Sequence, residues 1–158
     1  MPKISPVQCS TAHLCVLLLS LRTALMTLSN SSFAQSATEM ELIRERDQLG
    51  DEIGRLRADG QTEAVTRVRR MLEIEKQVSG PQHPDVARIL DYQTELLVEV
   101  DEWSEALESK TSAVAIWSAA FGPDHWRAKS GRSDLALLQT KSSLTPEQRQ
   151  RLAVAENG

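Results

Sequence analysis

Two stretches of the chain carry the same landmarks in the same order. Residues 63–87 are EAVTRVRRMLEIEKQVSGPQHPDVA, and residues 105–129 are EALESKTSAVAIWSAAFGPDHWRAK. Each begins with Glu-Ala and contains a Gly-Pro-x-His turn, at Gly80, Pro81 and His83 in the first copy and at Gly122, Pro123 and His125 in the second. Every landmark recurs after 42 positions. A fixed period of this length indicates a repeat architecture, around which the rest of the chain is organised.

The composition favours an all-α protein. Hydrophobic residues make up 41% of the 158 positions and charged residues 25%, as in an ordinary globular domain. Few segments alternate apolar and polar residues, and β-branched residues do not cluster in short runs, so strands have little support. We therefore predict helices throughout.

Charge is unevenly distributed along the chain. All 22 acidic residues lie after residue 34, whereas Lys3 and Arg22 precede it, so the later part has 22 acids against 16 bases. Such a balance argues against a surface for nucleic acid or for an anionic membrane. Cys9 and Cys15 also lie in the leading segment, and its removal would leave no thiol.

Residues 1–34 are predicted to be a signal peptide or an N-terminal anchor. Residues 14–28, LCVLLLSLRTALMTL, are mostly apolar, and Ser32 and Ala34 fit the small-x-small cleavage rule before Gln35. Arg22 inside the apolar run leaves two alternatives open, an uncleaved anchor and a start at Met40. Cleavage would give an exported protein, periplasmic or secreted, whereas a start at Met40 would give a cytoplasmic one.

Apolar residues at helical spacing predict helices from residue 38 to the Asp59-Gly60 turn and then at about 61–79, 84–100, 103–121 and 124–142. Gly80 and Gly122 suit left-handed C-terminal caps, and Pro84 suits a first helical turn. The predicted core positions include Leu49, Ile53, Ala64, Val68, Leu72, Val86, Ala87, Leu90, Leu96, Leu97, Ala106, Ala113, Ile116, Trp117, Ala120, Ala128, Leu135, Ala136 and Leu138.

A last short helix is predicted within residues 145–158, as a C-terminal cap on repeats that span residues 35–144. Its start signal is Thr145-Pro146-Glu147-Gln148, with a threonine at the N-cap and a glutamine at the capping-box position. Six helices joined by short turns would make three antiparallel hairpins. Hairpins stack because a single one cannot bury both of its apolar faces.

The spacing of Glu-Ala, the following helix and Gly-Pro-x-His resembles tetratricopeptide repeats of the kinesin light chain type, over about residues 38–142. The residues that carry the resemblance are Glu63, Ala64, Leu72, Ile74, Glu75, Lys76 and residues 80–87 in the first copy, and Trp103, Glu105, Ala106, Ile116, Phe121 and residues 122–125 in the second. Gln93, Thr94 and Trp126 depart from the family pattern. The resemblance implies a right-handed α-solenoid whose concave face holds a peptide or protein.

No catalytic constellation can be assembled from these residues. His83 and His125 occupy equivalent turns, so we expect them to form turns rather than a metal pair. Neither has a nucleophile motif nearby, and Gly-rich phosphate loops are absent from the sequence. The acidic residues of the third and fourth helices and the basic run at Arg67, Arg69 and Arg70 are interpreted as solvated faces. We expect no enzyme activity, cofactor or metal.

The resemblance places one set of third-helix residues in the concave groove: Arg88, Asp91, Glu95, Val98 and Glu99. With three acids in this set, we expect a protein or peptide partner with basic side chains. The leading hypothesis is a non-enzymatic binding module, a scaffold or adaptor. The alternative is a truncated sensory or scaffold segment of a larger signalling or peptidase protein. An apolar end of the stack would also allow a homo-oligomer.

Overall fold

The computed structural model describes residues 36–57 and 61–156. The chain divides into two units, Met1–Glu41 and Leu42–Gly158. In the first unit, residues 36–41 are helical. The predicted leader, both cysteines and the Asp59-Gly60 turn lie outside the described residues. Everything below concerns the second unit.

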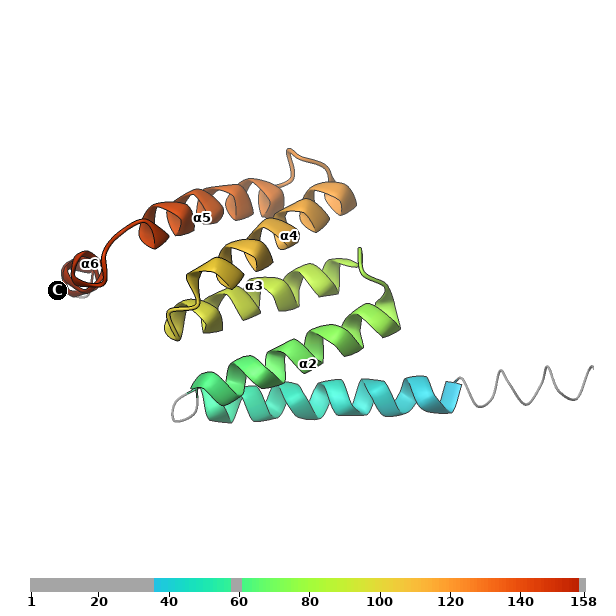
Figure 1. Ribbon diagram of the computed structural model, residues 1–158. Coiled ribbons are helices and arrows are strands. Elements are labelled where there is room, and N and C mark those ends of the chain that lie inside the picture. Colours follow the sequence, from blue (N-terminus) through green and yellow to red (C-terminus); the bar gives the residue numbers. More distant parts are fainter. Residues whose placement is uncertain (1–35, 58–60, 157–158) are drawn as a thin grey trace, which may run out of the picture. The chain divides into compact units, whose positions relative to one another are not determined.

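Every regular element in the described part of the second unit is an α-helix, as the sequence predicts. Residues 42–56 are helical, followed by α2 (Gln61–Ser79), α3 (Pro84–Glu99), α4 (Trp103–Phe121), α5 (Trp126–Ser142) and α6 (Pro146–Glu156). From α2 to α5 the helices lie side by side, and each runs back along the one before it (Figure 1). None of the described helices is both long and apolar enough to cross a membrane.

The two Gly-Pro-x-His turns have nearly the same backbone. Gly80 and Gly122 have φ values of 91° and 90°, which a residue with a side chain rarely adopts. His83 and His125 are the N-caps of α3 and α5, and the Nδ1 atom of each accepts a hydrogen bond from the backbone N–H two residues later, at 3.2 and 3.3 Å. The predicted role of both histidines in turns is confirmed.

One apolar core runs between the helices. It includes Ile53, Val68, Leu96, Leu97 and Ala113, which are almost fully buried. Two alanines predicted for the core, Ala120 and Ala136, are exposed instead. The core also takes side chains that the prediction missed: Val65, Ile74, Glu75, Ile89, Gln93 and Thr94. Thr94 satisfies its hydroxyl locally by donating to the Leu90 carbonyl at 2.8 Å.

The basic run of α2 ties neighbouring helices together. Arg69 forms a two-pronged pair with Glu105 of α4, and Arg70 forms another with Glu45. The hydrogen bond from Arg69 holds the pKa of Glu105 below its usual value. Arg69 and Arg70 are exposed, as expected, and their planar guanidinium groups also bridge to carboxylates on adjacent helices.

The last helix differs from the expected third hairpin. The capping box is present, because the Gln148 N–H donates to Thr145 Oγ1 at 3.3 Å and Gln148 Oε1 accepts from the Thr145 N–H at 2.8 Å. However, α6 lies beyond the end of α5 rather than along it (Figure 1). Its Arg149 stacks on Trp103, with 4.7 Å from guanidinium carbon to ring centre. Of the side chains described at positions 146–155, none is buried, so α6 contributes no buried apolar face to a hairpin with α5.

The outer surface of α5 is mostly polar, which limits the apolar stack end expected from the sequence. Its exposed residues include Lys129, Ser130, Ser133, Gln139 and Thr140. The large apolar side chains exposed on α5 are Trp126 and Leu137, which lie near opposite ends of the helix.

Helices α4 and α5 approach closely at Gly131. A Cβ atom built on Gly131 would lie 2.9 Å from Cγ2 of Val114, closer than real carbon contacts allow. Val114 is β-branched on a helix and has little rotamer freedom with which to move aside. The packing of α5 on α4 therefore requires a residue without a side chain at this position.

We predict that Gly131→Ala lowers the free energy of unfolding by about 1 kcal/mol, because the steric cost exceeds the gain in helix propensity. In a Val114→Ala background the same change should raise stability by about 0.5–1 kcal/mol. Urea unfolding of the four proteins checks this. A destabilising Gly131→Ala in both backgrounds would show that Val114 is not the obstacle.

Candidate functional site

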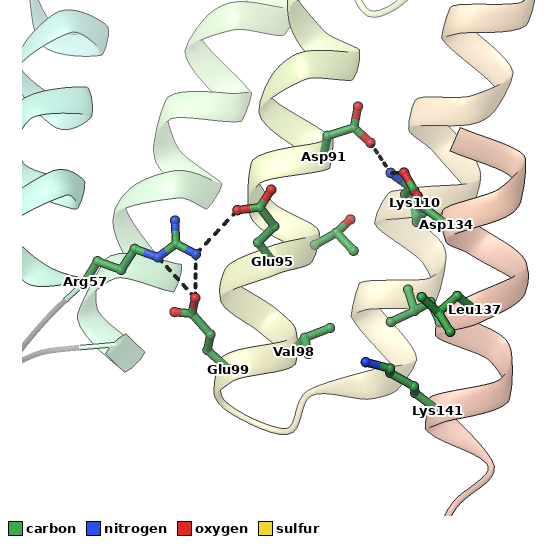
Figure 2. A pocket seen from close by; sticks show the side chains of 11 residues that line it. Arg57, Asp91, Glu95, Val98, Glu99, Lys110, Asp134, Leu137 and Lys141 are labelled. Atoms are coloured by element: carbon green, nitrogen blue, oxygen red, sulfur yellow. Dashed lines mark hydrogen bonds and ion pairs between the residues drawn. The ribbon is translucent and has the colours of Figure 1, made fainter. Parts of the chain in front are cut away.

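An open cavity of about 460 Å³ lies between α3 and α5 (Figure 2). Its floor and walls combine charged side chains with a few apolar ones. The lining residues are Arg57, Asp91, Thr94, Glu95, Val98, Glu99, Lys110, Asp134, Leu137, Leu138 and Lys141. We refer to this cavity as the α3–α5 groove.

Four of the five residues predicted for a concave groove line this cavity: Asp91, Glu95, Val98 and Glu99. They share one face of α3 because they recur at helical spacing. Arg88 does not line it. Its guanidinium instead contacts Asp85 in the preceding turn of the same helix, at 3.1 Å, and its side chain is 64% exposed.

The wall opposite α3 was not predicted from the sequence. It consists of Lys110 from α4 and of Asp134, Leu137, Leu138 and Lys141 from α5. One of these had a detectable signal. Lys110 falls in the series Ala106, Lys110, Ala113 and Trp117, whose steps of four, three and four define the buried face of a helix. A lysine on that face is expected to have carboxylate partners.

Lys110 is the centre of a polar network at the base of the groove. Its side chain is 11% exposed, and its ammonium contacts Oδ1 of Asp91 at 2.9 Å and Oδ2 of Asp134 at 3.0 Å. Asp91 Oδ2 accepts a further hydrogen bond from Trp117 Nε1 at 2.9 Å. Burial alone would lower the pKa of Lys110, but the hydrogen bonds to Asp91 and Asp134 outweigh it and raise that pKa. The lysine is thus held as a cation that joins α3, α4 and α5.

Arg57 pairs with the other two acids of the groove. Its guanidinium contacts Glu99 at 2.6 Å and Glu95 at 3.4 Å (Figure 2). The hydrogen bond with Glu99 raises the pKa of Arg57. A basic partner was expected because of Asp91, Glu95 and Glu99. Each of these acids is already paired with a cation of the same chain.

Apolar side chains occupy the middle of the groove. Val98 of α3 faces the cavity from one side, and Leu137 and Leu138 of α5 line the other. Leu137 is 55% exposed. An exposed leucine inside a cavity, between walls of paired charges, can contribute contact area to a bound side chain without disturbing the core.

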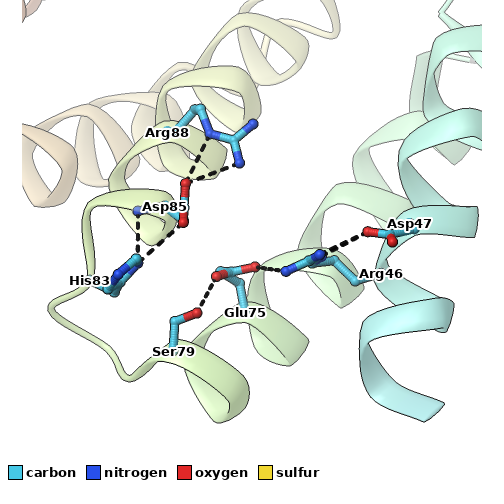
Figure 3. A network of polar contacts seen from close by, with 7 residues as sticks. All are labelled: Arg46, Asp47, Glu75, Ser79, His83, Asp85 and Arg88. Atoms are coloured by element: carbon cyan, nitrogen blue, oxygen red, sulfur yellow. Dashed lines mark hydrogen bonds and ion pairs between the residues drawn. The ribbon is translucent and has the colours of Figure 1, made fainter. Parts of the chain in front are cut away.

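A second polar cluster lies at the first Gly-Pro-x-His turn (Figure 3). Glu75 is 1% exposed, and its carboxylate accepts from Arg46 at 3.0 Å and from the Ser79 hydroxyl at 2.5 Å. Oxygen or nitrogen atoms of Glu75, His83 and Asp85 come within 4.8 Å of one another, as metal ligands would. However, both oxygens of Glu75 are engaged, and Nδ1 of His83 caps α3. We interpret this cluster as structural.

Comparisons with known proteins identify no family. No protein-family model matches the chain, and no curated protein matches it.

We predict that Lys110→Met lowers the free energy of unfolding by about 2 kcal/mol or more, because it leaves Asp91 partly buried without its cation. Lys129→Met is the matched control. Lys129 also pairs with one acid, Asp124 at 3.3 Å, but its side chain is 58% exposed, so the expected loss is below about 0.5 kcal/mol. Equal midpoints for both variants in urea would contradict a structural role for Lys110.

Proposed function

We propose that this protein is a non-enzymatic protein–protein interaction module that holds a peptide or an extended protein segment in the α3–α5 groove. The observation that carries the proposal is the groove itself. Predicted binding residues of α3 meet an exposed leucine of α5 in one open cavity large enough for side chains of a partner.

We further propose that the architecture is a right-handed α-solenoid of the tetratricopeptide type. In this view residues 42–56 with α2 form one hairpin, α3 with α4 form the next, and α5 begins a third. The 42-residue period, the two equivalent turns and the packing of successive helices support this proposal. The first helices of the hairpins would then line the concave face.

The charges of the groove argue for a partner that binds first through apolar contact. Four lining carboxylates face three lining cations, and Arg57 and Lys110 already pair with all four acids. The residual negative charge is small, so a basic partner is favoured only modestly. Val98, Leu137 and Leu138 supply the apolar surface that such a partner would cover.

We predict that Leu137→Glu weakens binding of a groove peptide by about tenfold or more, because it replaces apolar contact area with a carboxylate that the bound peptide would have to desolvate. Ala136→Glu is the control, since Ala136 is the neighbouring exposed residue and does not line the groove. Peptides selected from a random display library on the full chain would be measured by fluorescence anisotropy against both variants.

If the Leu137→Glu protein binds every selected peptide as tightly as wild type does, the peptides bind another face of the protein. Failure to select any peptide would reject the proposed function. Circular dichroism of both variants would verify that neither substitution unfolds the protein.

We predict opposite effects from the two ends of the Arg57–Glu99 pair. Arg57→Gln leaves Glu95 and Glu99 without their cation, so a lysine-bearing groove peptide should bind about threefold to tenfold more tightly at low salt. Glu99→Gln removes an acid and should weaken the same peptide. The measurement is the dissociation constant at low and high salt. Shifts of the same sign in both variants would show that groove charge does not act on the partner.

A further inference from the structure

The second Gly-Pro-x-His turn carries an exposed aromatic cluster that the first turn lacks. Phe121 is 49% exposed and Trp126 is 64% exposed. Their rings continue a stack from the buried Trp117, with centroid distances of 5.8 Å from Trp117 to Phe121, 4.8 Å from Phe121 to His125, and 5.8 Å from His125 to Trp126. We name Phe121, His125, Trp126 and Arg127 the second-turn patch.

The fold does not require these aromatic residues. At the equivalent positions of the first turn stand Ser79, Pro84 and Asp85, and that turn has the same glycine conformation and the same histidine cap. The backbone hydrogen bonds also match, from His83 N–H to Gly80 O and from His125 N–H to Gly122 O, both at 3.2 Å. The chain thus contains its own control, a turn of the same geometry without the patch.

Arg127 is held in a position suited to recognition. Its guanidinium carbon lies 4.7 Å from the ring centres of both Trp117 and Trp126. The two indoles attract the guanidinium as a cation, and a carboxylate can bind its N–H groups, often with two hydrogen bonds. Two aromatic contacts also restrict the side chain before any partner arrives, which lowers the entropy lost on binding.

The charge of this turn is opposite to that of most of the molecule. Arg127, Lys129 and Arg132 lie here against the single carboxylate of Asp124, which pairs with Lys129. Among the residues that the structure describes, no carboxylate pairs with Arg127 or Arg132. Arg132 donates instead to the Pro123 carbonyl at 2.7 Å. A cation in the first turn of a helix opposes the helix dipole. Asp85 therefore stabilises the start of α3, whereas Arg127 does not stabilise the start of α5 in this way.

We propose that the second-turn patch is a docking site for an acidic segment of a partner protein. A carboxylate of the segment would pair with Arg127, and an adjacent aromatic or large aliphatic side chain would cover Phe121 and Trp126. Charge complementarity favours an acidic partner, and the exposed rings favour one with apolar side chains beside its acids. Nucleic acid, which also stacks on aromatic rings, is disfavoured by the 22 acidic residues of the chain.

This site is separate from the α3–α5 groove. Trp126 is the first residue of α5 and Leu137 lies eleven residues later, which corresponds to about 16 Å along the helix axis. The two surfaces also have different chemistry, since the groove carries paired charges, whereas the patch carries the guanidinium of Arg127, with which no carboxylate of residues 36–57 or 61–156 pairs. One chain could therefore hold two partners, or two segments of one partner, at once.

The test uses a variant with the residues of the first turn: Phe121→Ser, Trp126→Pro and Arg127→Asp. The first turn shows that its backbone accepts all three. Random short peptides displayed on phage would be selected on the full wild-type chain and then measured against this variant. We expect enrichment of peptides with an acid next to an aromatic residue, and binding to the variant weakened by about tenfold or more. Added salt should also weaken the binding of these peptides to the wild-type protein.

Controls separate this site from the groove. Patch peptides should bind the Leu137→Glu protein as they bind wild type. Groove peptides should bind the triple variant as they bind wild type and should bind the Leu137→Glu protein more weakly. If the triple variant has a lower melting temperature, Arg127→Gln alone replaces it, and the loss should then follow the acid of the peptide. Three outcomes would each overturn the proposal. The selected peptides could lack acids, or they could bind wild type and variant equally. A single-stranded oligonucleotide could also displace them where glutamate-rich peptides do not.

Discussion

The ammonium group of Lys110 is the point at which three helices meet. A buried cation is costly unless it is paired, and its two acids come from different helices, Asp91 from α3 and Asp134 from α5. Apolar packing contributes little to the position of α5, because this helix buries only Ala128, Gly131 and Leu138. The polar link therefore specifies where α5 lies against α3 and α4. Since the groove is the space between α3 and α5, its width depends on the same three side chains.

The two equivalent turns separate what the fold needs from what the surface can vary. Glycine with positive φ, proline after it and a histidine cap occur in both and produce the same backbone. The positions around them differ, with a serine, proline and aspartate in one turn and Phe121, Trp126 and Arg127 in the other. A repeat with such local determinants can change its exposed side chains without losing its turn. Recognition surfaces can consequently arise at turns as well as along the groove.

Local signals explain which parts of the structure could be predicted. The C-terminal ends of α2 and α4 follow from Gly80 and Gly122, and the start of α6 follows from the capping box at Thr145, because each signal acts within one turn of helix. The α3 wall of the groove was expected from the resemblance to tetratricopeptide repeats, and helical spacing brings its residues to one face. The opposite wall depends on which helices become neighbours, so the α5 residues could not be assigned to it, and Arg57 could not be assigned to the groove. The position of α6 could not be predicted from the sequence either, because its start signal does not indicate what the helix packs against.

Ion pairing explains why the charge of the sequence is a poor guide to a partner. A count of acids on α3 suggests an acidic groove, yet Arg57 and Lys110 neutralise those acids at contact distance. Paired charges create only short-ranged fields, which salt screens further, so they position a ligand more than they attract it. An unpaired guanidinium acts differently, because it keeps its full capacity to bind an anion. We therefore propose Arg127 as an electrostatic determinant of partner choice, on a chain whose net charge has the opposite sign.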